Sequence, residues 1–304
     1  MKWRKLGRVY VAQGESDWAQ THAYIPTPVC LGEVIRVYVA FLDKHRVGRI
    51  GFVDLQADNP LMVVNVSKRP VLDVGQPGTF DGSGVTPLCL INENNRRLLY
   101  YIGWQRAVDI PYCLFVGLAV SDDQHPEAFV RYSQVPLLDR SPNELFIRTA
   151  SFVLNDDGLY KMWYVGGSRW IDVRGKKLPM YNLKYLESDN AYSWGREGIM
   201  SMEVSNPDEI GFGRPFVIRE NNRYKMWYSV RTISKGYRLG YAESLDGVQW
   251  ERKDGQVGID VCSSGWDSEM ICFASILDVK GQRYMFYNGN NYGETGFGLA
   301  VLER

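Results

Sequence analysis

Apolar and polar residues alternate along most of the chain in short runs that Gly, Asn and Asp separate. Alternation with a period of two predicts β-strands with one buried face, and almost no segment shows the 3.6-residue period of an amphipathic helix. In the clearest stretch we expect strands at residues 216–219, 224–229 and 237–243, and a fourth that begins at Glu251. The pattern therefore predicts an all-β fold built from short antiparallel strands.

A strand rich in aromatic residues recurs along the chain and sets the scale of the fold. Its five copies begin at Arg36, Leu98, Tyr160, Tyr224 and Tyr284. The equivalent tyrosines within them, Tyr38, Tyr101, Tyr164, Tyr228 and Tyr287, are spaced by 63, 63, 64 and 59 residues. A repeat of this length with four strands per unit is typical of a propeller. We therefore predict a five-bladed β-propeller with four antiparallel strands in each blade.

Five such units take up almost all of the 304 residues, so we expect a single domain over residues 1–304. A ring of blades must be closed, and an N-terminal strand that completes the last blade is the natural device. The segment from Trp3 to Val11 is the candidate for this strand. The repeated tyrosines are expected to pack blade against blade, because buried aromatic area dominates the energetics of a core.

Two turns share a motif that indicates a family. The sequence reads Glu-Ser-Leu-Asp-Gly-Val-Gln-Trp from Glu243 and Glu-Ser-Asp-Asn-Ala-Tyr-Ser-Trp from Glu187. The Asp and Ser side chains can cap backbone amides of the turn, so we interpret the motif as structural. This turn, after a Tyr-x-Met-Trp-Tyr strand, resembles the blades of five-bladed propeller glycosidases. That superfamily includes glycoside hydrolase families 43 and 32, the invertases and levansucrases, and the mannoside phosphorylases of family 130.

The resemblance extends over nearly the whole chain and implies a propeller that acts on carbohydrates. The invertase motifs Trp-Met-Asn-Asp-Pro, Arg-Asp-Pro and Glu-Cys are absent from this sequence. No catalytic role can therefore be transferred from those motifs, and the site has to be argued from position along the repeats.

The composition and the absence of certain motifs exclude several classes of partner and cofactor. The 35 basic residues balance the 35 acidic residues, so no nucleic-acid partner is expected, and no apolar run is long enough for a membrane span. The N-terminal residues lack the apolar segment of a secretory signal, and the five cysteines show no CxxC spacing, which favours reduced thiols and a cytoplasmic location. Neither metal-binding histidine spacing nor a nucleotide-binding motif is present, so no metal or other cofactor is expected.

Ionisable residues stand at equivalent positions before the first strand of each unit. They are His22, Asp81, Glu144, Glu209 and Asp267. Since the first strand of each propeller blade lines the axis, these side chains would meet at one site. The alternative is that loops entering a strand are polar in any propeller, with no functional meaning.

Glycoside chemistry needs two carboxyl groups on opposite sides of the scissile bond. Asp81 lies in a glycine-flanked loop that would allow close approach of a ligand, and we take it as the candidate base or nucleophile. Glu269, Asp267 and Glu144 are the candidates for the acid. Arg148 would lower the pKa of Glu144 and make it less suitable in that role.

The remaining candidates would bind a substrate. Aromatic rings can stack on a sugar, arginines can hold a phosphate or a carboxylate with two hydrogen bonds, and amides can bond hydroxyl groups. The predicted substrate-binding residues are His22, Trp104, Arg148, Trp170, Arg214, Arg231, Lys235, Arg238 and Asn290. A solvated hairpin at residues 231–238 and a plain Asn-Gly turn near Asn290 are the alternatives.

The sequence thus favours a carbohydrate-active enzyme that cleaves or transfers a glycosyl group by carboxylate catalysis at the propeller axis. Its partner would be a small carbohydrate or an activated sugar. A glycoside phosphorylase, a sugar transferase of cytoplasmic polysaccharide assembly, and a catalytically inactive sugar-binding propeller are the alternatives.

Overall fold

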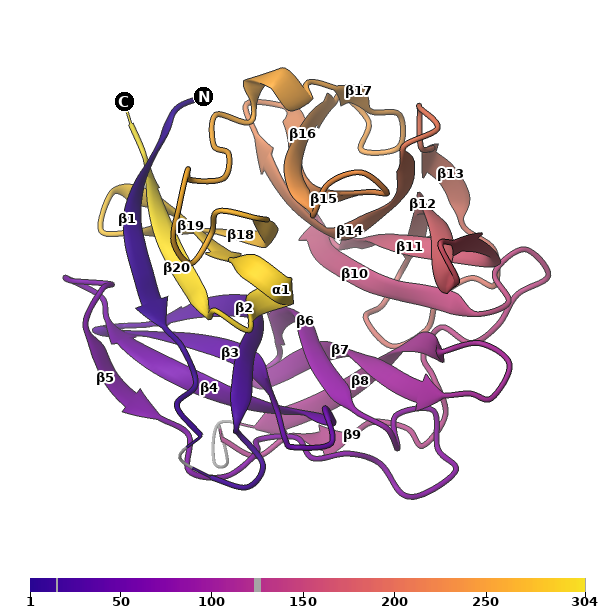
Figure 1. Ribbon diagram of the computed structural model, residues 1–304, viewed down its shortest axis with the longest axis horizontal. Helices are drawn as coiled ribbons and strands as arrows, with labels where there is room; N and C mark the ends of the chain where they lie inside the picture. Colours follow the sequence, from indigo (N-terminus) through magenta and orange to yellow (C-terminus); the bar gives the residue numbers. More distant parts are fainter. Residues whose placement is uncertain (15, 123–126, 304) are drawn as a thin grey trace.

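The computed structural model describes residues 1–14, 16–122 and 127–303. Nearly all of its regular structure is β-strand, arranged as sheets around a common centre (Figure 1). The exceptions in the described part are a short helical turn, α1 (Asn290–Gly293), and a 3-10 turn at Asp254–Gln256. The all-β propeller predicted from the repeats is confirmed.

Antiparallel pairing divides the described strands into five groups of four, which follow one another along the chain. The first group contains β2 (Thr21–Leu31), β3 (Val34–Leu42), β4 (Gly48–Gln56) and β5 (Val63–Val66). The second contains β6 (Val85–Glu93), β7 (Arg96–Arg106), β8 (Tyr112–Asp122) and β9 (Val130–Arg131). The third contains β10 (Ile147–Asp156), β11 (Leu159–Val173), β12 (Lys176–Ser188) and β13 (Ile199–Met202).

The fourth group contains β14 (Glu209–Glu220), β15 (Arg223–Thr232), β16 (Arg238–Ser244) and β17 (Glu251–Arg252), in agreement with the strands predicted there. The last group contains β18 (Cys272–Val279), β19 (Gln282–Asn288) and β20 (Phe297–Leu302), which β1 (Trp3–Tyr10) completes. The first strands of the groups touch in a closed cycle, β2–β6–β10–β14–β18–β2. These five inner strands therefore surround the axis of the molecule.

The N-terminal strand closes the ring as predicted. β1 pairs antiparallel with β20, from Trp3 opposite Leu302 to Tyr10 opposite Phe297. The Trp3 amide also donates to the Gly258 carbonyl (3.0 Å), and the Trp3 ring packs edge-on against Trp227 at 6.4 Å. The two ends of the polypeptide therefore share one sheet (Figure 1).

Each inner strand is interrupted by a β-bulge at about the same height. The register of the first hairpin in each group shifts between Tyr24 and Thr27, Pro87 and Cys89, Thr149 and Phe152, Gly213 and Phe216, and Cys272 and Ser275. In four groups a non-glycine residue in the bulge has positive φ: Ile25 (52°), Ala150 (50°), Arg214 (40°) and Phe273 (58°). A bulge changes the direction of one side chain, so these strands each present a residue that regular alternation would not.

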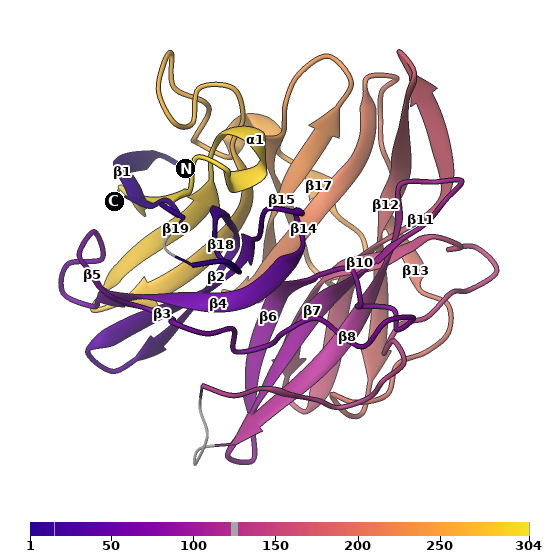
Figure 2. The ribbon, with the colours of Figure 1, turned by 60° about the horizontal axis from the view of Figure 1, so that its bottom comes forward.

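The segment at residues 168–180, which interrupts the third repeat, extends the β11–β12 hairpin. Trp170 lies opposite Pro179 and Val173 lies opposite Lys176 in this extension. The tip of the hairpin and α1 lie on the same side of the molecule (Figure 2).

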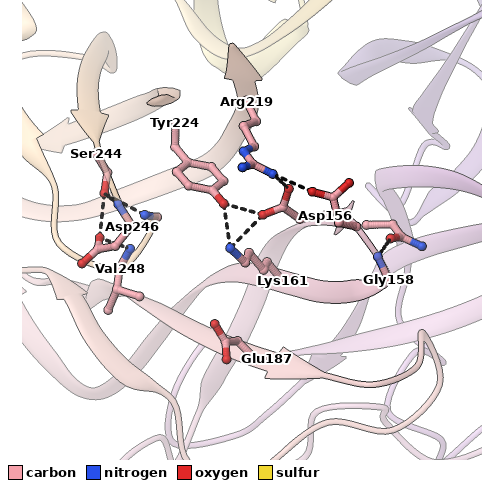
Figure 3. A network of polar contacts seen from close by, with 12 residues as sticks. Asp156, Gly158, Lys161, Glu187, Arg219, Tyr224, Ser244, Asp246 and Val248 are labelled. Atoms are coloured by element: carbon pink, nitrogen blue, oxygen red, sulfur yellow. Dashed lines mark hydrogen bonds and ion pairs between the residues drawn. The ribbon is translucent and has the colours of Figure 1, made fainter. Parts of the chain in front are cut away.

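Polar contacts bind neighbouring groups near the tips of their first hairpins. Asp156, at the end of β10, accepts hydrogen bonds from Tyr224 and Arg219 of the next group and from Lys161 of its own (2.8 Å) (Figure 3). Burial opposes ionisation of this carboxyl, but the hydrogen bonds lower the pKa of Asp156 to about 2. The Asp156 carboxylate is therefore ionised and links the third and fourth groups.

The recurring turn has the structural role expected of it. The Asp246 carboxylate accepts hydrogen bonds from the amides of Val248 (2.8 Å) and Gln249 (2.9 Å) and from the Ser244 hydroxyl (2.9 Å) (Figure 3). The buried Trp163 of the third group donates to the Gly247 carbonyl (2.7 Å). The turn therefore also joins adjacent groups.

We expect Trp3→Ala to lower the free energy of unfolding by about 3 kcal/mol, because it removes a large buried side chain from the closing strand. Lys2→Ala is the matched control, since that side chain is exposed and its ion pair with Glu303 contributes little. Urea unfolding followed by tryptophan fluorescence measures both. Equal stability of the two variants would show that β1 does not hold the ring closed.

Candidate functional site

A cavity of about 560 Å³ lies at the centre of the ring. All five inner strands contribute to its wall, through residues such as Tyr24 of β2, Thr86 of β6, Thr149 of β10, Gly213 of β14 and Phe273 of β18. The volume falls within the range of about 300–1,000 Å³ that is typical of small-molecule sites. The axis is therefore the candidate functional site.

The bulges shape this cavity. The four bulge residues with positive φ, Ile25, Ala150, Arg214 and Phe273, all line it. Non-glycine residues in this conformation cost about 1–3 kcal/mol each and cluster at functional sites. The strained backbone is thus concentrated around the axis.

Two groups of aromatic side chains form part of the wall. In the first, the Tyr112 ring lies 5.1 Å from Trp104 and 5.3 Å from Trp170, both in edge-on contacts. The Trp104 indole donates to the Thr86 hydroxyl (3.0 Å), which fixes the ring in place. Trp104 and Tyr112 line the cavity, whereas Trp170 supports Tyr112 from outside the lining set.

The second aromatic group surrounds Phe273. Its ring lies 5.2 Å from Tyr24 and 5.5 Å from Tyr237, and Tyr237 in turn lies 5.8 Å from Tyr292 of α1. All four residues line the cavity. Burial raises the pKa values of Tyr24 and Tyr237 well above the usual range, so both phenols are protonated at neutral pH.

Arg214 binds the inner strands together on the buried side of the cavity. Its guanidinium donates to the carbonyls of Phe273 and Ala274 (both 3.1 Å), to the Leu88 carbonyl (3.0 Å) and to the Thr27 hydroxyl (2.9 Å). All these acceptors are neutral, and burial lowers the pKa of Arg214 to about 9. The side chain therefore still carries a positive charge at neutral pH, with no carboxylate partner among the described residues.

A second arginine lies among hydroxyl groups. The Tyr181 and Tyr237 hydroxyls are 2.8 Å apart and share a hydrogen bond, and Arg231 Nη1 donates to the Tyr181 hydroxyl at 3.4 Å. All three residues line the cavity, and they come from β12, β15 and the segment that precedes β16. The arrangement presents several hydrogen-bond donors to one region of the wall.

His22 is buried on the cavity wall. Burial, reinforced by the charge of Arg46 and opposed by Glu294, lowers the pKa of His22 to about 4. The imidazole is therefore neutral at neutral pH, and its Nδ1 lies 3.0 Å from the Thr21 hydroxyl. It can exchange hydrogen bonds with a ligand without adding charge.

The charged side chains that line the cavity are all positive. No Asp or Glu is present among the described residues that line it, whereas the arginines are Arg46, Arg106, Arg214 and Arg231. Arg46 and Arg106 are exposed to solvent, and Arg214 is almost fully buried. The site therefore suits a ligand with negative charge or many hydrogen-bond acceptors.

The acidic residues that were predicted to surround the axis instead form hydrogen bonds and ion pairs within their own four-stranded groups. Asp81 accepts hydrogen bonds from the Tyr101 hydroxyl (2.9 Å) and from Arg131 of the outer strand β9 (2.7 Å). Asp267 has the same pair of contacts, from the Tyr287 hydroxyl (3.0 Å) and from Lys5 of β1 (2.6 Å). Each carboxylate therefore joins an entry loop, a second strand and an outer strand.

The third and fourth groups use variants of this arrangement. Glu144 accepts a hydrogen bond from Tyr164 (3.2 Å) and pairs with Arg148 (3.1 Å) and with Lys184 of β12. Glu209 pairs with Arg252 of β17 (2.8 Å), which lowers the pKa of that carboxyl.

Of the five ring positions, only His22 lines the cavity, and the expectation that all five side chains meet at one site does not hold. The bulges explain the difference, because they direct residues of the strands rather than of the entry loops toward the axis.

The other predicted residues divide into two sets. Trp104, Arg214 and Arg231 line the cavity together with His22. Those outside the lining set are Arg148, Trp170, Lys235, Arg238, Glu269 and Asn290.

Three of the outside residues lie close together. Arg238 pairs with Asp260 (3.1 Å) and donates to the Glu269 carbonyl (2.8 Å), and the Asn290 side chain accepts from the Glu269 amide (2.8 Å). The Glu269 side chain is exposed and has no ion pair among the described residues. It differs in this from the other three carboxyl candidates.

Several cavity residues were not predicted, namely Tyr24, Arg46, Arg106, Tyr112, Tyr181, Tyr237 and Tyr292. The sequence carried a signal for Tyr24, which lies two positions after His22, one of the residues that the repeats placed at the axis. The others lie on second or third strands, or on loops, whose orientation toward the axis depends on the twist of the blades.

The fold and the cavity define a β-propeller of the kind found in glycoside hydrolases, and comparison with known proteins gives the family. No family model matches the sequence. The chain belongs to the family of the uncharacterized protein Rv1502 of Mycobacterium tuberculosis (strain ATCC 25618 / H37Rv), to which it is 34% identical over 304 residues, the full length of both proteins. The protein MT1551 of Mycobacterium tuberculosis (strain CDC 1551 / Oshkosh) matches equally, at 34% identity over the full length.

Solved structures support the fold. A complex of BT0996 with RGII has a TM-score of 0.76 and 19% identity, over 98% of this protein and 91% of that one. A structure from the GH130 family of mannoside phosphorylases has a TM-score of 0.73 and 14% identity, over 99% and 93%. A thermostable family-43 glycoside hydrolase has a TM-score of 0.68 and 17% identity, over 94% and 90%. These likenesses confirm the glycosidase-type propeller fold that the repeats predicted.

We expect Asp81→Asn to lower the free energy of unfolding by about 3 kcal/mol, because it leaves Arg131 without the buried half of its ion pair. Asp157→Asn is the control, since that carboxylate is almost fully exposed and should contribute less than about 0.5 kcal/mol. Urea unfolding measures both variants. A loss no larger than that of the control would remove the structural role assigned to Asp81.

His22 predicts a pH dependence of stability. Because its pKa is about 4 in the folded protein and about 6.5 when unfolded, the unfolded state binds the extra proton between these values. Stability should therefore fall as the pH is lowered from 6.5 to 4, by up to about 3 kcal/mol from this group. His22→Asn, which tolerates the positive φ, should flatten the curve in that window only. Identical pH profiles for the two proteins would contradict the prediction.

Proposed function

We propose that the protein is carbohydrate-active and binds its sugar in the axial cavity. The observation that carries the proposal is the composition of the wall, where aromatic rings alternate with hydroxyl and guanidinium donors. An aromatic ring can stack on the apolar face of a pyranose, while the polar groups bond its hydroxyls. The glycosidase-type propellers that share the fold support the same conclusion.

Trp104 and Tyr112 are the proposed stacking residues. Both are only partly buried, so ring surface remains for a ligand. Their contact at 5.1 Å and the Trp104–Thr86 hydrogen bond hold the rings in fixed positions, which lowers the entropy lost on binding. Thr149 also lies in the cavity wall, and its buried hydroxyl has no hydrogen-bond partner among the described residues.

The contacts of the predicted acids favour sugar binding over carboxylate catalysis as the first function. A glycosidase places two carboxyls on either side of the scissile bond. Asp81, Glu144 and Asp267 are each almost fully buried and already paired with a cation. Catalysis by any of them would require its ion pair to break, which costs several kcal/mol.

Cleavage or transfer of a glycosyl group is the second candidate, and Glu269 is the observation that favours it. This carboxyl is exposed and unpaired in the described part of the structure. Its neighbour Met270 accepts a hydrogen bond from the amide of Tyr292, a residue of the cavity wall (3.4 Å). Glu269 would then supply the acid at the rim of the site.

We further propose that the protein acts in the cytoplasm. The five cysteines are all free, as expected in a reducing compartment. No helix among the described residues is long and apolar enough to cross a membrane.

A glycan array tests the proposal. We expect the fluorescently labelled protein to retain a subset of glycans, and Trp104→Ala to weaken the retained interactions about tenfold or more through loss of the stacked ring. Tyr132→Ala removes an aromatic residue that is exposed and outside the cavity lining, and should bind as the unaltered protein does. Retention of no glycan, or equal binding by the Trp104 variant, would overturn the proposal.

A further inference from the structure

We propose that the carbohydrate carries a negatively charged group, a carboxylate or a phosphate, and that Arg231 holds this group together with Tyr181 and Tyr237. The inference rests on the proposed function and narrows it to acidic or phosphorylated sugars.

The first argument is the missing countercharge. Three other arginines that are substantially buried pair with carboxylates, namely Arg36 with Asp54 (2.8 Å), Arg148 with Glu144 (3.1 Å) and Arg252 with Glu209 (2.8 Å). Arg231 is partly buried, and it donates its hydrogen bond to the neutral phenol of Tyr181 instead. A desolvated cation without a partner is costly, and an anionic ligand would remove that cost.

The second argument is the geometry around Arg231. Its guanidinium has five N–H donors; one of them bonds the Tyr181 hydroxyl and another faces the Tyr112 phenol, so donors remain for a ligand. The Tyr181 and Tyr237 hydroxyls share one hydrogen bond, which leaves one phenolic hydrogen free to donate. Together they can offer the fork of donors that matches a carboxylate or a phosphate.

The backbone supports this arrangement. Gly211 pairs with Arg231 across the β14–β15 ladder, and a Cβ at Gly211 would lie only 2.5 Å from the Tyr181 ring. Only glycine at this position lets Tyr181 lie against β14 and reach Tyr237. The contacts of Tyr237 with Phe273 and Tyr292 then hold its ring. The donor cluster is therefore preorganised.

The third argument is the charge of the rest of the cavity. Arg214 adds a second cation that is held only by neutral acceptors, and its buried Nε has no hydrogen-bond partner among the described residues. Arg46 and Arg106 add exposed positive charge to the same cavity. His22 is neutral, and no carboxylate among the described lining residues offsets these charges. The whole cavity thus attracts an anion.

The experiment is a glycan array with three arms, namely neutral glycans, glycans with a uronate and glycans with a phosphate. The unaltered protein should retain one of the two acidic classes and release it as salt is raised, and that class identifies the charged group. Arg231→Gln should weaken the retained interactions about 10- to 100-fold, and Arg231→Lys should restore part of the affinity. Arg223→Gln, at the exposed start of the same strand, is the matched control and should have no effect.

The outcomes separate this inference from the proposed function. Equal retention of neutral and acidic glycans, or unchanged binding by a folded Arg231→Gln, would overturn the anionic ligand and leave sugar binding intact. Retention of no glycan by the unaltered protein would overturn both. If Arg231→Gln fails to fold, Tyr237→Phe keeps the test decisive, because it removes only a hydroxyl and should still weaken acidic glycans about fivefold or more, while unchanged binding would count against the proposal.

Discussion

A buried carboxylate that joins three parts of one blade is the interaction on which this propeller depends. In the second group, Asp81 connects the entry loop to Tyr101 of the second strand and to Arg131 of the outer strand. In the last group Asp267 makes the equivalent contacts, but its cation is Lys5 of the N-terminal strand. The ion pair that holds a blade together therefore also closes the ring at that point. A blade has only a narrow core of its own, so these ties orient each sheet relative to the loop that enters it.

The same interaction determines the chemistry of the axis. Because the acidic side chains turn into the blades, the cavity keeps arginines without carboxylates beside them, and its electrostatic field is positive. A glycosidase needs the opposite arrangement, with carboxyls facing the ligand. This protein thus shares the propeller fold of glycosidases, while its predicted acids pair with cations inside the blades. The residues that face the cavity are those that suit recognition, namely aromatic rings, hydroxyls and guanidinium groups.

The sequence predicted the architecture well and the site only in part, for physical reasons that differ. The spacing from Tyr38 to Tyr287 and the closing strand from Trp3 follow from strand alternation and repeat length, which are local properties of the sequence. The repeat spacing also identified Asp81 and Asp267 at equivalent positions, but it could not show that tyrosines and cations of the blade already bind them. Lys235 and Arg238 lie near Arg231 in sequence, yet only Arg231 lines the cavity. Lys235 lies in the turn after β15, which ends at Thr232, and Arg238 begins β16 and pairs with Asp260. Direction relative to the axis depends on bulges and twist, which one sequence does not reveal.

The strained bulges indicate why the axis should carry the function. Four inner strands hold a non-glycine residue at positive φ, and one of these is the β-branched Ile25, for which the conformation is especially unfavourable. Glycine at these positions would relieve the backbone, but it would remove the side chains that the bulges direct into the cavity. At Arg214 the strained residue also provides the hydrogen bonds that join three other inner strands. Arg214 therefore combines a strained backbone, a buried charge and contacts between blades. A ligand anion near this residue would offset part of the buried charge, so binding at the axis should also stabilise the ring.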